Sequence, residues 1–316
     1  MRRINKRGFE MSFGWMFSII AGAVIIFLAI YATTQFIEVD RTQRDTEIGK
    51  EVGILLTPLE TGLDTSRAAK IIMPVESRIF NSCDNRGNFG SQQISVSTRS
   101  GIGEEWQEAG VPSSFHNKYL FSSDESEGKN YNIFVKPLEM PFKVADLIFL
   151  WSDKESYCFV QPNLDVEDDI NDLSLENMFV VSDVGECPDG SKSVCFVNSG
   201  CDIDVNENSK SVKKKRRTET VFYEGDLIYG AILSSPDTYN CQVKRLMGRA
   251  SEIALLNVAK GSYLSVKGCR SDRITGNLIS YSNKTKSLGE SLELREINFL
   301  SDEIRRQNEN LGCKLF

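Results

Sequence analysis

A run of 27 uncharged residues near the start of the chain, 11–37, constrains the fold more than any other feature. As a helix rising ~1.5 Å per residue it would reach about 40 Å, more than the ~30 Å hydrocarbon core of a membrane. A secretory signal has a shorter apolar core of ~7–15 residues, followed by small residues at a cleavage site. Here Ala21-Gly22-Ala23 lies in the middle of the run and no such pattern follows its end. The sequence therefore predicts an uncleaved membrane anchor that spans once.

The charges on either side of this run set its expected orientation. The following segment mixes three basic residues with five acids, whereas the first seven positions of the chain hold four basic residues and no acid: Arg2, Arg3, Lys6 and Arg7. The more basic flank of a membrane span usually stays on the cytoplasmic side. We therefore expect a protein of the cytoplasmic membrane with its N-terminus inside and its C-terminal domain outside.

Eight cysteines follow the anchor, and none lies before or within it: Cys83, Cys158, Cys187, Cys195, Cys201, Cys241, Cys269 and Cys313. An even number beyond a membrane anchor is typical of disulfides in an oxidising exterior, and eight buried free thiols are the alternative. A zinc site is not expected, because no pair has the close spacing of a zinc knuckle and the only histidine is His116.

Two disulfide pairings are suggested by the local sequence. Cys187 and Cys195 bracket a Pro-Asp-Gly turn, which could join them across a hairpin. Cys241 begins one predicted C-terminal helix and Cys313 follows the other, so an antiparallel helix pair would bring them together. Cys83 and Cys158 are further candidates without an assigned partner.

The hydrophobic pattern divides the chain into five expected parts. They are a cytoplasmic basic tail (1–10), a transmembrane helix (11–37), an amphipathic stalk helix (38–66), a β-rich ectodomain (67–235) and a C-terminal helical part (236–316). The stalk has apolar residues at helical spacing, among them Ile48, Val52 and Leu55. The expected fold class is α+β, with a long N-terminal helix, a mainly antiparallel β-rich ectodomain and a C-terminal antiparallel helix pair.

Several segments of the ectodomain receive a specific expectation. Short apolar runs separated by Gly, Asn, Asp and Ser predict strands, and the run 227–233 is assigned to one of them. One short helix is expected at 165–175. In the C-terminal part, helices are expected from Cys241 to near Gly261 and over 290–310. Asn283-Lys284-Thr285, in the expected loop between them, is an acceptor sequence for an N-linked glycan.

The charge balance excludes one class of partner. The net charge is −7, which argues against general nucleic-acid binding, since that function needs a positive footprint. A single basic run, 213–217, stands between polar segments. We interpret it as a solvated hairpin tip, with a docking patch for anionic lipid or glycan as the alternative.

No motif for catalysis, a cofactor or a metal stands out. His116 lies in a polar loop without a nucleophile motif around it, and Ser211-x-x-Lys214 falls within a solvated basic run. The series Asp202-x-Asp204-x-Asn206-x-Asn208 resembles half of a calcium loop, but the required glycine and final glutamate are replaced. The sequence thus predicts neither an enzyme nor a cofactor-binding protein.

The residues before the anchor resemble those of a known family. Lys6-Arg7-Gly8-Phe9-Glu10, ahead of a long apolar run that continues into a stalk, is similar to a type IV pilin-like (class III) signal. The resemblance implies cleavage between Gly8 and Phe9 and packing of the apolar helices into a filament core. The chain departs from the pattern, because Phe13 stands where the family has a glutamate, five positions after the cut. More loosely, the N-terminus resembles single-pass envelope proteins of small-genome archaea.

Together these features predict a membrane-anchored, extracytoplasmic structural or interaction protein of the cell envelope, acting in assembly, adhesion or partner binding. Its expected partners are membrane lipid, through residues 11–37, and other envelope proteins or further copies of itself. Two alternatives remain open: a pilin-like filament subunit, and an envelope enzyme whose site is built from scattered acids.

Overall fold

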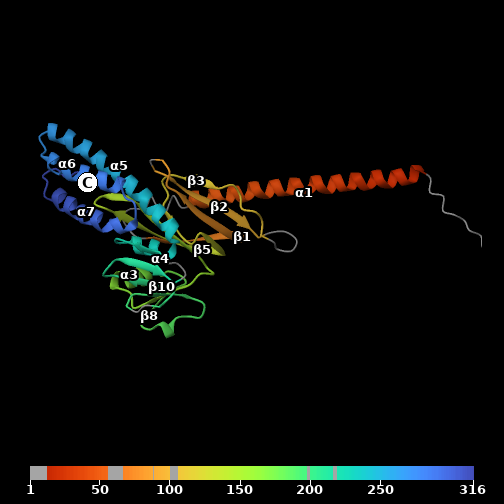
Figure 1. Ribbon diagram of the computed structural model, residues 1–316, viewed down its shortest axis with the longest axis horizontal. Helices are drawn as coiled ribbons and strands as arrows, with labels where there is room; N and C mark the ends of the chain where they lie inside the picture. Colours follow the sequence, from red (N-terminus) through yellow and green to blue (C-terminus); the bar gives the residue numbers. More distant parts are fainter. Residues whose placement is uncertain (1–12, 56–66, 88, 100–105, 198–199, 216–218) are drawn as a thin grey trace, which may run out of the picture.

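The structure is a computed structural model that describes residues 13–55, 67–87, 89–99, 106–197, 200–215 and 219–316. It has an α+β fold with an N-terminal apolar helix, two sheets and C-terminal helices, as the sequence predicts. One long helix, α1, projects from a head that contains all the strands (Figure 1).

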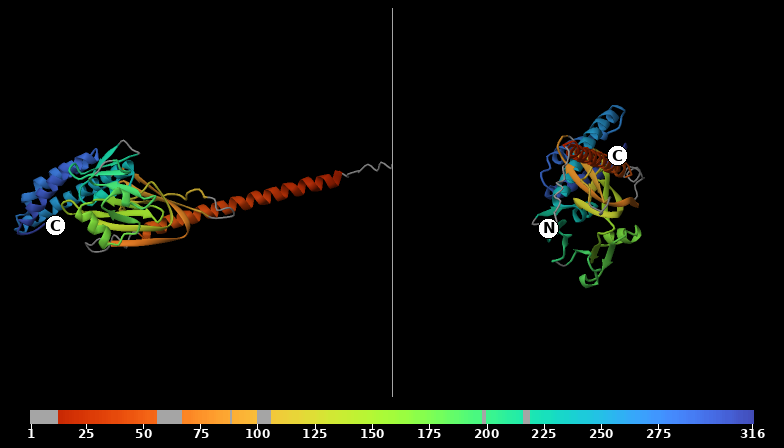
Figure 2. Two further views of the ribbon diagram at one scale, coloured as in Figure 1. Left: turned by 90° about the horizontal axis from the view of Figure 1, so that it is seen from below. Right: turned by 90° about the vertical axis from the view of Figure 1, so that its right-hand side faces the viewer.

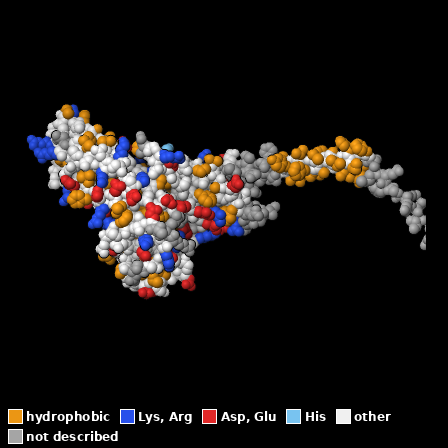
Figure 3. All heavy atoms as spheres, in the orientation of Figure 1, with side chains coloured by type: hydrophobic (Ala, Val, Ile, Leu, Met, Phe, Trp, Pro, Cys, Tyr) orange, Lys and Arg blue, Asp and Glu red, His pale blue; other side chains and the backbone are white. Residues whose placement is uncertain are grey.

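Helix α1 runs without interruption from Phe13 to Leu55. Its segment Phe13–Thr33 is apolar enough to cross a membrane, and none of it is buried against the head. Figure 3 shows hydrophobic side chains covering this free part. The last turns of α1 instead lie on strands β2 and β3, where Val52 is buried as predicted. The expected stalk thus exists up to Leu55, and its proposed continuation to residue 66 falls outside the described residues.

The first sheet has the strand order β3-β2-β1-β5-β6-β4 and is antiparallel except for the β4–β6 pair. Its strands are β1 (Arg67–Asp84), β2 (Ser91–Thr98), β3 (Ser113–Phe115), β4 (Leu120–Phe121), β5 (Glu125–Glu139) and β6 (Lys143–Ser152). Side chains alternate between its two faces, as the period of a strand requires. Ile133 and Ile148 face α1, whereas Phe134 and Phe149 belong to the larger core on the opposite face.

The second sheet has the order β12-β11-β10-β9-β7-β8 and lies on the side of the first sheet away from α1 (Figure 2). Its strands are β7 (Tyr157–Val160), β8 (Met178–Val181), β9 (Lys192–Cys195), β10 (Ile203–Asn206), β11 (Ser211–Lys214) and β12 (Thr220–Phe222). Three of its pairings, β7 with β8, β7 with β9 and β9 with β10, are parallel. The short crossovers between these strands were not evident in the sequence pattern.

The helices of the head correct two expectations. The α-helices of the described head are α3 (Leu164–Asp172), α4 (Leu227–Leu233), α5 (Pro236–Val266), α6 (Thr275–Lys286) and α7 (Leu294–Glu309). Helix α3 confirms the short helix expected there. The prediction of a strand at 227–233 is wrong, because this run forms α4, whose seven residues are all buried. Helix α6 occupies the expected loop, so the described C-terminal part has three helices in place of a pair.

Candidate functional site

The junction between α1 and the head is built from close backbone contacts and one buried carboxylate. Asp45 is 1% exposed, and its side chain accepts hydrogen bonds from the backbone N–H of Thr98 at 3.2 Å and its hydroxyl at 2.8 Å. Gly53 lies against the ring of Phe115, where an added Cβ would be 2.0 Å from the ring carbon Cζ. Helix α1 and the first sheet therefore form one packed unit.

Four disulfides hold the head together: Cys83–Cys241, Cys158–Cys187, Cys195–Cys201 and Cys269–Cys313. Cys83–Cys241 joins strand β1 to helix α5, across 158 residues of sequence. Disulfides of this number are typical of an oxidising compartment outside the cytosol. The apolar helix, for its part, fits a membrane anchor or a signal sequence by length and composition.

Both suggested pairings are wrong. Strands β8 and β9 lie on opposite sides of β7, so the segment between Cys187 and Cys195 is not a hairpin, and Cys187 bonds to Cys158. Cys241 bonds to Cys83 and Cys313 bonds to Cys269. With α6 inserted between them, α5 and α7 end at the same side of the head, which brings Cys313 to the end of α5.

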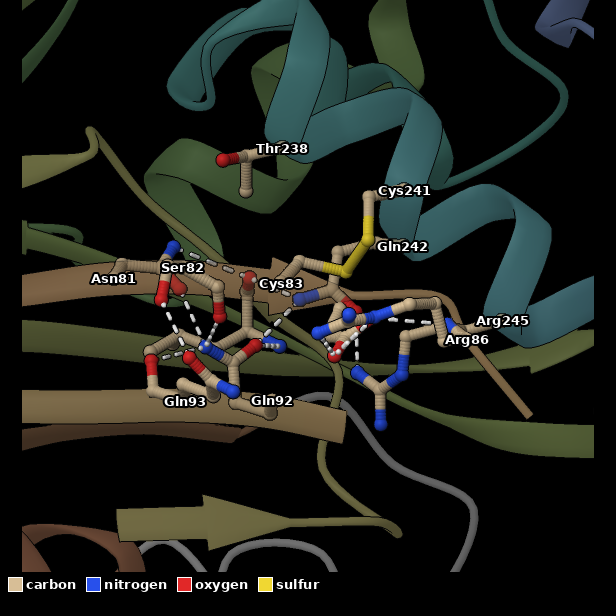
Figure 4. The surroundings of a disulfide bond; sticks show 12 residues. Asn81, Ser82, Cys83, Arg86, Gln92, Gln93, Thr238, Cys241, Gln242 and Arg245 are labelled. Carbon is tan, nitrogen blue, oxygen red and sulfur yellow. Dashed lines mark hydrogen bonds and ion pairs between the residues drawn. A yellow bond between two sulfur atoms is a disulfide. The ribbon is translucent and has the colours of Figure 1, made fainter. Parts of the chain in front are cut away.

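A buried polar network lies beside the Cys83–Cys241 disulfide (Figure 4). The side chain of Gln242 donates to Gln92, and Gln92 in turn donates to Asn81 at 2.5 Å. Arg245, 2% exposed, donates to Gln242 at 2.7 Å and to four backbone carbonyls, those of Phe89, Phe115, His116 and Lys118. Burial lowers the pKa of Arg245 to about 10. These bonds satisfy the buried groups, so the network fixes α5 on the first sheet.

A cleft of about 270 Å³, lined mainly by polar and acidic residues, lies at the N-terminal end of α4, and we call it the acidic cleft. Its lining includes four carboxylates and one lysine: Asp165, Asp169, Glu207, Asp226 and Lys210. At its edge, Lys136 from β5 lies between Asp169 and Asp226, 2.5 and 2.8 Å from their oxygens. The acids come from α3, from the β10–β11 turn and from the residue before α4.

Three of the four carboxylates in the acidic cleft, those of Asp169, Asp226 and Glu207, are engaged within the protein. Tyr229 donates its hydroxyl to Asp169 at 2.6 Å, and Asn163 donates to Glu207 at 2.5 Å. Burial raises the pKa of Asp226, against the effect of Lys136. Burial opposes the charge of Lys136, but its bonds to Asp169 and Asp226 outweigh this and raise its pKa. Asp226 also lies at the N-terminal end of α4, where negative charge is favourable.

A second cleft, of about 470 Å³, opens at the C-terminal end of α4. Lys214 from β11 donates there to the backbone carbonyls of Ile232 and Ser234, which the end of the helix leaves without helical partners. The acids at one end of α4 and this lysine at the other both complement the helix dipole. The charges around α4 therefore have a structural role.

The remaining candidate residues are not brought together into a site. The ring of His116 bonds to the backbone carbonyl of Gly90 at 2.7 Å. Asp202 accepts from Ser193 and Asp204 accepts from Gly200 and Cys201, so both hold backbone turns. Among the residues that the structure describes, no three His, Cys, Asp or Glu side chains are grouped as a metal site would require.

Two predicted modification sites differ in their outcome. Gly8 and Phe9 lie outside the described residues, so cleavage there stays a prediction. Asn283 is exposed, but it lies on α6 and not in a loop. Thr285, which the acceptor sequence requires, is 2% exposed and donates its hydroxyl to Tyr281. The folded head therefore presents this sequence poorly for glycan transfer.

The sequence did not reveal three residues that connect distant segments of the fold: Asp45, Lys136 and Arg245. Each was hidden because its partners are distant in the chain; Asp45, for example, bonds to a residue 53 positions away. A charged residue on the predicted buried face of a helix was the only available signal for Asp45.

Comparison of the chain with protein-family models, with curated proteins and with solved structures finds no match.

Proposed function

We propose that the protein is a single-pass envelope protein that holds a disulfide-bonded interaction head outside the cytoplasmic membrane. The observation that carries this proposal is the continuity of α1, whose apolar first half is free of the head while its last turns pack on β2 and β3. A helix that enters the head without a break transmits a fixed orientation from membrane to head. Such rigidity suits a subunit that acts through assembly, adhesion or partner binding.

The orientation rests on two independent features. The basic residues before the span favour an internal N-terminus, and the four disulfides favour an oxidising exterior for the head. Three of the four carboxylates in the acidic cleft, those of Asp169, Asp226 and Glu207, are held by partners within the protein, which favours a non-catalytic role over the enzyme alternative.

Membrane fractionation combined with protease treatment of intact cells tests this proposal. The protein should stay with the membrane after alkaline washing, and added protease should remove the head without lysis. A cytoplasmic-domain membrane protein, detected in the same samples, serves as the control for cell integrity. Release by alkaline washing, or a head protected until lysis, would contradict the proposal.

The second candidate function is a filament subunit. It is favoured by the layout of α1, in which an exposed apolar half precedes a half packed on a mainly antiparallel sheet. In a filament, the exposed halves of many copies would pack against one another. Electron microscopy of sheared cell-surface material, with labelling of the head, would detect such filaments, and a strain lacking the protein provides the control.

A further inference from the structure

Exposed basic side chains gather at the end of the head opposite to the free part of α1 (Figure 3). Four of them lie within four positions of the Cys269–Cys313 disulfide, and we call them the basic tip: Lys267, Arg270, Arg273 and Lys314. The disulfide holds the end of α5 and the segment after α7 together. The hydroxyl of Ser271 adds a hydrogen bond to the backbone carbonyl of Cys313 at 2.9 Å.

The cations of the basic tip are not neutralised by acids of the described head. The chain carries a net charge of −7, and many of its other cations are paired with acids, as Lys154 is with Glu127 and Arg99 is with Glu76. Among the side chains that the structure describes, none of the four tip residues takes part in an ion pair. Their charge is therefore available to an external anion.

Two exposed apolar side chains lie next to these cations. Val266 is 84% exposed and Tyr263 is 64% exposed, both on the last turns of α5. The ammonium of Lys267 lies 5.7 Å from the centre of the Tyr263 ring, so the aromatic and basic groups share one surface. Cations beside exposed apolar groups are the combination that binds the interface of an anionic membrane.

We infer that the basic tip binds the anionic headgroups of a second membrane, apposed to the one that holds α1. The free part of α1 and the tip lie at opposite ends of the molecule, so the tip faces away from the protein's own membrane (Figure 1). A soluble polyanion would engage the cations but would gain nothing from Val266. This inference rests on the proposed anchoring and gives the interaction head a partner.

The test uses the full chain incorporated through α1 into nanodiscs of neutral lipid. Vesicles with about 30% anionic lipid should bind these nanodiscs in a flotation assay, neutral vesicles should not, and added salt should weaken the binding. Each neutralised cation should weaken binding about fivefold, so Arg270→Gln with Arg273→Gln should weaken it more than about tenfold. Val266→Ser should also weaken it.

Lys129→Gln with Lys286→Gln is the matched control, because both lysines are exposed and the double change removes the same charge elsewhere on the head. Equal loss in this control, or equal binding of neutral vesicles, would overturn the inference. The inference would also be overturned if the protein bound polyphosphate but not vesicles, and if Val266→Ser left the polyphosphate binding unchanged. That result would indicate a soluble polyanion as the partner. Failure to enter nanodiscs would instead refute the anchoring, whereas incorporation without vesicle binding refutes only the inference.

Discussion

At the scale of single residues, the junction of α1 with the head depends on a position where no side chain fits. Gly53 lies on the buried face of α1, and an added methyl group would overlap the ring of Phe115. We expect Gly53→Ala to destabilise the head by about 1–3 kcal/mol, because the ring or the helix must shift. Chemical denaturation of the detergent-solubilised chain, followed by tryptophan fluorescence, measures this change.

Gly276→Ala is the matched control for this prediction. Gly276 lies in α6 with no atom within 4 Å of the position its Cβ would take. In a helix with open space, alanine is favoured over glycine by up to about 1 kcal/mol, so this variant should be slightly more stable. If the two glycine-to-alanine substitutions change the free energy of unfolding in opposite directions, the effect of packing is separated from that of helix propensity. Equal changes would contradict the packing argument.

At the scale of elements, the hydrophobic pattern predicted the longer strands and helices α1, α3, α5 and α7, but not helices α4 and α6. The sequence of helix α4 resembles that of a buried strand, since none of its seven residues is charged and all of them are buried. Helix α6 was missed because serine, asparagine and threonine give it little apolar periodicity. The acidic cleft could not be predicted, since Lys136, Asp169 and Asp226 come from three separated segments. The two suggested disulfide pairings were wrong for the same reason, although the cysteines do form disulfides.

The element-level role of the Cys83–Cys241 disulfide is to tie β1 to α5. It closes a loop of 158 residues, whereas Cys195–Cys201 closes one of 6. From the loop-entropy relation, replacing the first pair with serine should cost about 5 kcal/mol and replacing the second about 2 kcal/mol. Denaturation of the two double variants measures the difference. Equal losses would mean that loop length does not set the contribution of these bonds.

A network of ion pairs connects β1, β5 and the turn after β6, and it makes the stability of the fold depend on pH. Lys154, in the turn after β6, contacts Glu76 of β1 and Glu127 of β5. Hydrogen bonds from Lys154 lower the pKa of both glutamates from the usual 4.5. A lowered pKa stabilises the fold while the carboxylate is ionised, so this stability is lost as the pH falls below about 4.5.

Lys154→Met should therefore flatten the loss of stability between about pH 6 and about pH 3. Thermal unfolding across this range measures the slope. Lys129→Met is the control, since Lys129 is an exposed residue of β5 with no ion pair among the described side chains, and its slope should match that of the unaltered protein. An unchanged slope in the Lys154 variant would show that the network does not determine the acid response.

At the scale of the whole molecule, the open alternatives differ in what happens to the N-terminus. A lone anchor retains the tail that precedes the span, because Arg2, Arg3, Lys6 and Arg7 hold its orientation. A filament subunit would instead lose it between Gly8 and Phe9, and would pack its apolar helix against those of other copies. Phe13 replaces the acid that the pilin-like pattern places there, so such packing would lack its charged partner.

We therefore expect the mature protein to keep residues 1–8. N-terminal sequencing or intact-mass measurement of protein purified from its own membrane distinguishes the two states. A stricter test is to co-express the protein with a class III signal peptidase and to determine its N-terminus again. The variant Gly8→Leu, which should block such cleavage, is the control. A chain that begins at Phe9, and no longer does so in the Gly8 variant, would make the exposed half of α1 part of a filament core. The head would then be displayed along a fibre, in place of standing alone on the membrane.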